Sequence, residues 1–130
     1  MIVLDGSAAV EWLLHTRAGL RVEERVFRRT ETIHAPHLMD IEVVHALRRL
    51  VAARVIPAVR AQEAIDDLLD LFLRRHPHDA FLPRVWEMRD NITAYDAVYV
   101  ALAELLDAPL ITCDARLAAA PGHFARVEFV

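Results

Sequence analysis

The feature of this sequence that most constrains its fold is a series of short apolar runs separated by longer helical segments. Two of these runs stop at an aspartate: Ile2-Val-Leu4 is followed by Asp5, and Pro109–Cys113 is followed by Asp114. Strands that alternate with helices along a chain indicate a parallel sheet with helices packed against its faces. The sequence therefore predicts an α/β fold of three layers, with a mostly parallel central sheet flanked by helices.

Hydrophobic periodicity and capping residues give the expected boundaries of the elements. Residues 94–106 are apolar nearly all round, which is typical of a buried helix. Residues 57–73 have the clearest helical period, with one apolar side made of Ile65, Leu68, Leu69, Phe72 and Leu73. Further helices are expected at 8–14, 18–29, 37–54, 82–89 and 115–119, and strands at 2–4, 32–34, 76–80, 109–113 and 127–130.

Length and composition exclude several classes of protein. A chain of 130 residues with 55% hydrophobic residues is expected to form one domain over residues 1–130. A net charge of −4 argues against non-specific coating of nucleic acid, although a nuclease that carries its own metal is compatible with it. The single cysteine, Cys113, excludes an internal disulfide and fits a reducing compartment. Because we find neither a basic leader nor an apolar stretch of about 18 residues, we expect a cytoplasmic protein that does not span a membrane.

Four acidic residues lie in apolar or small-residue surroundings, where a carboxylate without a partner is costly. They are Asp5, Glu42, Asp96 and Asp114. Ligands of open α/β sheets bind beyond the carboxyl ends of the strands, so Asp5 and Asp114 are expected to meet there. A divalent cation is the simplest agent that would compensate all four charges.

Each of these acids also has a purely structural interpretation. Asp5 and Asp114 could cap the helices that follow them. Glu42 could form an ion pair with Arg49, which lies on the same face of its helix. Asp96 could cap its helix as well, but Thr93 is placed to do so and would leave Asp96 free. Other residues favour ordinary roles: a surface pair for Glu24 and Arg28, a loop for His76–Asp79, core or interface positions for Trp12 and Trp86, and packing for Tyr95, Tyr99 and Cys113.

Taken together, the four acidic segments resemble the PIN-domain nucleases, and more closely the VapC-type toxins of bacterial toxin–antitoxin pairs. The resemblance covers the whole chain and rests on Asp5-Gly-Ser7-Ala, on Pro36 and Leu38 ahead of Glu42, on Ala94-Tyr-Asp96-Ala-Val-Tyr-Val-Ala-Leu-Ala, and on Thr112-Cys-Asp114-Ala-Arg-Leu117. It implies a PIN-like fold with a metal-binding, catalytic set of Asp5, Glu42, Asp96 and Asp114, supported by Ser7 and Thr112.

The resemblance also implies an activity: metal-dependent hydrolysis of RNA phosphodiester bonds by a toxin that a cognate antitoxin inhibits. Carboxylate oxygens suit Mg²⁺ or Mn²⁺, and one or two such ions can activate water and stabilise the leaving oxygen. The expected partners are RNA, a VapB-like antitoxin that sends an arginine to the acidic pocket, and a second copy of the chain. The apolar side of residues 65–73, with Val43, Val44 and Leu47, favours this homodimer because it exceeds what a small core needs.

Two other function classes are compatible with parts of the sequence. An acidic-site phosphatase or receiver-like domain would share the sheet and the acidic edge, but these proteins typically depend on a lysine. All 15 basic residues here are arginine, and Asp5-Gly-Ser7 lacks the second aspartate of the phosphatase motif. A non-catalytic module that holds a structural metal ion is the other alternative, and metal-dependent RNA cleavage separates it from the nuclease.

Overall fold

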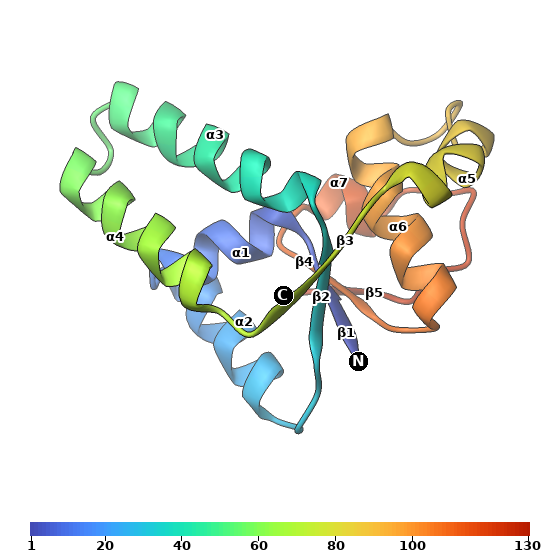
Figure 1. Ribbon diagram of the computed structural model, residues 1–130, viewed down its shortest axis with the longest axis horizontal. Helices are drawn as coiled ribbons and strands as arrows, with labels where there is room; N and C mark the ends of the chain where they lie inside the picture. The colour runs from blue at the N-terminus through green and yellow to red at the C-terminus, as the bar shows by residue number, and fades with distance from the viewer.

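A five-stranded parallel sheet forms the centre of the computed structural model, which describes residues 1–130 (Figure 1). The strand order is β3-β2-β1-β4-β5, and every neighbouring pair is parallel. Helices cover both faces, so the central strand is fully buried, as is usual for parallel sheets. The strands are β1 (Ile2–Leu4), β2 (Ile33–Pro36), β3 (Leu73–His76), β4 (Leu110–Thr112) and β5 (Val127–Phe129).

The helices are divided between the two faces of the sheet, which confirms the predicted three-layer α/β architecture. Helices α1 to α4 lie on one side and α5 and α6 on the other (Figure 1). Helices α3 and α4 pack against each other and project beyond the sheet. The bounds are α1 (Gly6–Leu13), α2 (Arg17–Phe27), α3 (Leu38–Ala52), α4 (Ala58–Asp70), α5 (Leu82–Glu87), α6 (Ala94–Leu106) and α7 (Ala115–Ala118).

Helix α6 lies against β1, β2 and β4 and is the most buried helix of the protein. Its residues 97–103 are all buried, in agreement with the apolar pattern that extends all round it. The Thr93 side chain accepts a hydrogen bond from the Asp96 amide and caps the helix. Asp107 ends it in the left-handed conformation, with φ 46°. None of the helices is both long and apolar enough to cross a membrane.

The third strand lies earlier in the chain than the sequence predicts. The strand expected at residues 76–80 is β3 at Leu73–His76, and Asp79–Phe81 forms a 3₁₀ turn instead. Helix α4 correspondingly ends at Asp70 rather than at 73, because Leu71 adopts extended backbone angles. Leu73 pairs with Ile33 in the sheet, so its place in the apolar helical period is coincidental. β3 is an edge strand and contains two arginines, so its sequence lacks the apolar pattern by which a strand is usually predicted.

The crossovers place the beginnings of several helices at one edge of the sheet. β1 ends at Leu4 and α1 begins at Gly6, while β4 ends at Thr112 and α7 begins at Ala115. β2 leads into α3 in the same direction. Because all strands are parallel, their carboxyl ends open toward one common region.

Candidate active site

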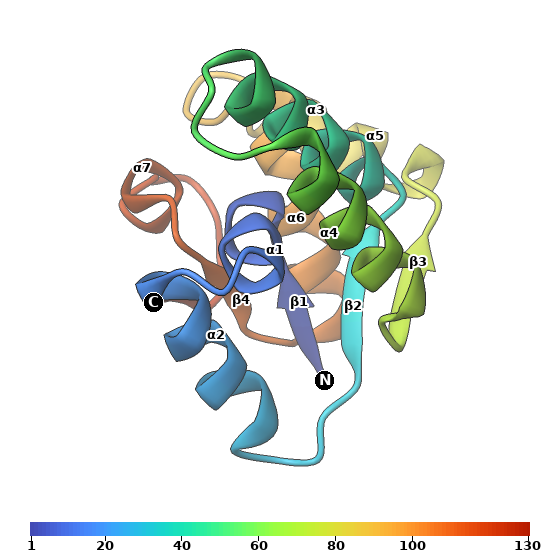
Figure 2. The ribbon, with the colours of Figure 1, turned by 90° about the vertical axis from the view of Figure 1, so that its left-hand side faces the viewer.

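All four predicted acidic residues line one cavity of about 670 Å³ at the carboxyl edge of the sheet. Asp5 lies between β1 and α1, Glu42 in α3, Asp96 in the first turn of α6, and Asp114 between β4 and α7. The end of β1 and its surrounding helices can be followed in Figure 2. Apolar and aromatic side chains complete the wall: Val10, Leu38, Ile41, Tyr95 and Tyr99.

Asp5 is buried at the floor of the cavity and held by several hydrogen bonds. Its Oδ1 accepts from the Ala8 amide at 2.9 Å and from Ser7 Oγ at 2.8 Å. Its Oδ2 accepts from Thr112 Oγ1 at 2.8 Å. This bond from Thr112 ties β4 to the end of β1, and Thr112 Oγ1 in turn accepts from the Asp114 amide at 2.9 Å. Asp5 therefore caps α1 and faces the cavity as well, and these two roles do not exclude each other.

Glu42 is held by a tyrosine that the sequence interpretation assigned to packing alone. The hydroxyl of buried Tyr99 donates a hydrogen bond to Glu42 Oε2. The expected alternative, an ion pair with Arg49, is not among the ion pairs of the structure. A Cβ atom on Gly6 would lie 3.1 Å from Glu42 Oε2 and 3.4 Å from the Tyr99 hydroxyl, so this close approach favours glycine.

Asp96 and Asp114 lie at the more open part of the cavity. Because Thr93 caps α6, the Asp96 side chain is free of that role and faces the cavity half-buried. Asp114 caps α7 by accepting from the Arg116 amide at 2.8 Å. Its other oxygen lies 3.6 Å from the guanidinium of Arg116, which is almost fully exposed. Asp114 thus combines its structural role with a position on the cavity wall.

Burial and mutual repulsion disfavour the charged forms of these carboxylates. Desolvation raises the pKa of Asp5, and the charge of Asp96 adds to this effect. Desolvation also raises the pKa of Glu42, despite the Tyr99 hydrogen bond, with further contributions from Asp96 and Asp5. For Asp96, desolvation and then the Asp114 charge raise the pKa. Such a cluster of raised carboxylate pKa values in a cavity is typical of a functional site.

The donor set of the cavity fits a hard divalent cation. Its acidic oxygens have hydroxyl neighbours from Ser7 and Thr112, and the basic side chains among its lining residues are His45 and Arg49. In this conformation no group of three or more acidic, histidine or cysteine side chains is arranged to hold one ion. Mg²⁺ does not need such a cage, because it keeps several waters and binds through one or two carboxylates.

Other residues singled out in the sequence lie away from the cavity. Glu24 and Arg28 form the expected surface pair at 3.4 Å. His76 stacks on His34 across β2 and β3, with ring centroids 5.1 Å apart, and therefore belongs to the sheet rather than to a loop. Trp12 is buried, whereas Trp86 is exposed beneath the Arg89 guanidinium. The roles of Tyr99 and Gly6 were missed, although Tyr99 follows Asp96 by three residues on the same helical face.

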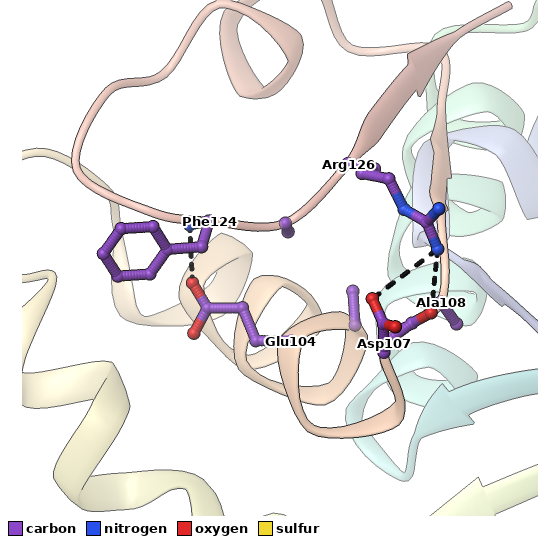
Figure 3. Close-up of a pocket in the computed structure, with 7 residues that line it drawn as sticks. Glu104, Asp107, Ala108, Phe124 and Arg126 are labelled. Atoms are coloured by element: carbon purple, nitrogen blue, oxygen red, sulfur yellow. Dashed lines mark hydrogen bonds and ion pairs between the residues drawn. The ribbon is translucent and has the colours of Figure 1, made fainter.

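A second cavity, at the end of α6, provides a contrast (Figure 3). Here the Phe124 amide donates to Glu104 Oε1 at 2.8 Å, and Arg126 contacts Asp107 at 3.6 Å. Glu104 also receives the Arg84 guanidinium at 2.8 Å. Glu104 and Asp107 are thus both paired with arginine, whereas Asp5, Glu42 and Asp96 of the acidic cavity are in no ion pair.

Comparison with known sequences identifies relatives over the full chain. The sequence matches the PIN domain family over residues 2–122. Ribonuclease VapC12 of Mycobacterium tuberculosis is 46% identical over 130 residues, covering 100% of this chain and 99% of that protein. Ribonuclease VapC1 of the same species is 43% identical over 129 residues, covering 98% and 96%.

Solved structures agree on the fold. PAE2754 from Pyrobaculum aerophilum superposes with a TM-score of 0.71 at 20% identity, covering 97% of this chain and 81% of that one. VapC20 of Mycobacterium tuberculosis, described as a sarcin–ricin loop cleaving toxin, gives 0.68 at 16% identity, with 92% and 94% covered. The sequence matches confirm the resemblance drawn from the four acidic segments: the chain belongs to the PIN-domain family and, within it, to the VapC proteins.

Proposed function

We propose that this protein is a metal-dependent endoribonuclease, the toxin of a toxin–antitoxin pair, which hydrolyses RNA phosphodiester bonds in its acidic cavity with Mg²⁺ or Mn²⁺. The observation that carries the proposal is the convergence of Asp5, Glu42, Asp96 and Asp114 on one cavity, where the pKa values of the first three are raised. Its relatives with the highest identity reported above are named ribonucleases, which supports RNA as the substrate.

In this proposal the four carboxylates surround the ion, binding it directly or through its waters, and their neighbours orient them. Ser7 and Thr112 fix both oxygens of Asp5. Tyr99 fixes Glu42, and burial beside that carboxylate raises the Tyr99 pKa so that the hydroxyl remains a donor. Such neighbours usually matter for metal affinity, because they set the direction of the ligand oxygens.

When bound, a divalent ion would neutralise charge on the phosphate and make water a better nucleophile. The protein itself contributes a preorganised cavity that is open to solvent, so that an RNA strand can enter it. Attack of water on phosphorus forms one P–O bond and breaks the P–O bond to the leaving ribose oxygen, which takes a proton. No protein nucleophile is required.

The test is cleavage of RNA by the purified protein with Mg²⁺ or Mn²⁺, and with excess EDTA. We expect cleavage with either metal, none with EDTA, and a loss of at least about a hundredfold in Asp96→Asn. The matched control is Asp90→Asn, since Asp90 is exposed and lies outside the cavity. Cleavage that persists in EDTA, or that Asp96→Asn retains, would contradict the proposal.

An antitoxin that covers the cavity is the proposed protein partner. An acidic pocket is blocked most simply by a cation, so the partner is expected to place an arginine among the four carboxylates. Adding the product of the neighbouring reading frame to the cleavage assay should suppress activity in proportion to complex formed. Unchanged cleavage in a saturated complex would contradict this mode of inhibition.

We also propose that the toxin is a homodimer, although only part of the apolar surface that the sequence indicated is exposed. Val43, Leu47 and Leu68 are buried in the core and are not free for an interface. Exposed apolar side chains nevertheless remain on α3, on α4 and just after α4: Ile41, Val44, Leu69 and Phe72, the last 97% exposed. Sedimentation at high micromolar concentration checks this proposal, and a monomer there would count against it.

A further inference from the structure

Helix α3 carries a basic side chain on the wall of the acidic cavity. The cavity-lining residues Glu42, His45, Ala46 and Arg49 follow one another at helical spacing and therefore share one face of α3. Arg49 is exposed and is the only arginine among the lining residues. The helical rise places it about 10 Å along the axis from Glu42.

No acidic side chain neutralises Arg49. It takes part in none of the ion pairs of the structure, even though five carboxylates line the same cavity. Arginines near acids elsewhere are engaged: Arg75 lies 2.7 Å from Asp40, and Arg84 lies 2.8 Å from Glu104. Arg49 is therefore available to an anion from outside the protein.

A substrate strand supplies such an anion next to the acidic centre. Phosphates of RNA approaching these carboxylates meet repulsion, so a nearby cation would offset part of that cost. A guanidinium suits this role because it binds phosphate oxygens through two parallel hydrogen bonds. About 10 Å from Glu42 is too far for the scissile phosphate itself, but a flanking nucleotide of the same strand can reach Arg49.

We infer that Arg49 binds a backbone phosphate flanking the scissile bond, so that the RNA strand runs along α3 from Glu42 past His45 to Arg49. The inference rests on the proposed ribonuclease function and adds a substrate-binding residue and a strand path to it. Arg49 is a binding residue here, and the carboxylates around Glu42, at the other end of this helical face, remain the site of hydrolysis.

The chain provides a matched control in Arg48. It is exposed, adjacent in the sequence, free of ion pairs and outside the cavity lining, because it points about 100° away around the helix. Arg48→Gln and Arg49→Gln remove the same charge from neighbouring positions. Any difference between them therefore reports the position of the charge and not the net charge of the protein.

The cleavage site is first mapped by treating total RNA with the wild type, and a short single-stranded RNA containing that site is then made. Cleavage kinetics are measured on this RNA at several salt concentrations. For Arg49→Gln we expect KM to rise about tenfold with little change in kcat. The dependence of log kcat/KM on log salt should become shallower by about 0.7, the value for one phosphate contact with a single strand. Arg48→Gln should match the wild type, and Arg49→Lys should keep the salt slope while recovering only part of KM.

Three outcomes would overturn the inference. Equal kinetics for Arg48→Gln and Arg49→Gln would remove the phosphate contact while leaving the ribonuclease proposal intact. If Arg49→Gln altered only inhibition by the antitoxin, the arginine would belong to the protein partner. If the wild type cleaved no RNA with Mg²⁺ or Mn²⁺, the proposed function would fail and this inference with it.

Discussion

Beside the amino ends of β1 and β4, acidic side chains are paired with arginine, whereas at the carboxyl ends of the same strands they face a cavity. On the amino side, Arg25 lies 2.9 Å from Glu31 and 2.6 Å from Glu128, in a depression that includes Met1 and Pro109. The Arg25 hydrogen bond lowers the pKa of Glu31. At the carboxyl side, desolvation raises the pKa of Asp5, Glu42 and Asp96.

The difference separates charges that stabilise the fold from charges that, in our proposal, bind a metal ion. A carboxylate paired with arginine contributes to stability, while a desolvated carboxylate among others of its own charge reduces it. The protein has enough arginines to pair both groups, yet the one on the cavity wall, Arg49, makes no ion pair. Stability is therefore reduced at the carboxyl edge, which is a common property of functional sites.

The largest expected effect contrasts one acid from each edge in an activity assay. Asp5→Asn should lower RNA cleavage by at least about a hundredfold, because it removes a carboxylate from the proposed metal site. Glu31→Gln, at the opposite edge, should leave the rate of the folded protein unchanged. Initial rates of both variants, measured well below the melting temperature, test this difference. Similar losses in both would contradict a special role for the carboxyl edge.

The same contrast predicts an unequal effect of two arginine substitutions on stability. Arg25→Gln leaves Glu31 and Glu128 partly buried without their partner and should lower the free energy of unfolding by about 1–3 kcal/mol. Arg49→Gln removes no ion pair and should change it by less than about 0.5 kcal/mol. Urea denaturation of both variants measures this difference, and an equally large loss in Arg49→Gln would show that it is structurally engaged.

A smaller effect is expected for the tyrosine that holds Glu42. Tyr99→Phe keeps the buried ring but removes the hydroxyl that donates to Glu42, so activity should fall about tenfold. Additional Mg²⁺ should restore part of this loss if the hydroxyl acts by orienting a metal ligand. A loss that is independent of the metal concentration would instead indicate a packing defect.

The smallest effect is a difference in the pH dependence of metal-free stability. Because the pKa of Asp96 is raised on folding, the native state holds extra protons between the unfolded and folded pKa values. Stability is lost as the pH rises through that interval, so Asp96→Asn should gain stability relative to the wild type there. The pKa of Glu104 is lowered by Arg84, so Glu104→Gln should be less stable at neutral pH, and its deficit should shrink as the pH falls. Urea denaturation in EDTA, from acidic to neutral pH, tests both the expected gain in Asp96→Asn and the expected loss in Glu104→Gln.

The sequence predicted the elements whose patterns are local and uniform. β1 is buried on all sides and α6 is buried over residues 97–103, so the residues there are apolar, and the parallel topology then brings Asp5 and Asp114 together. β3 was misplaced because edge strands tolerate polar residues such as Arg74 and Arg75. Cytoplasmic location and the homodimer remain predictions.

Within the site, residue identities were predictable but contacts across the fold were not. The four acids and the two hydroxyls stand in recognisable local motifs. The hydrogen bond from Tyr99 to Glu42 joins α6 to α3, and the close approach of Gly6 to both depends on how α1 packs between them. Such contacts depend on tertiary packing and leave no periodic signal in the sequence.

The most direct test of the central claim, that the four carboxylates form one metal site, is the stabilisation of the protein by Mg²⁺ or Mn²⁺. Melts of the wild type, Asp96→Asn and the control Asp90→Asn are recorded in EDTA and at a saturating metal concentration. The wild type and Asp90→Asn should gain about 2–3 kcal/mol at roughly a hundredfold excess over the dissociation constant, and Asp96→Asn much less. Equal metal-induced shifts in all three proteins would contradict the claim.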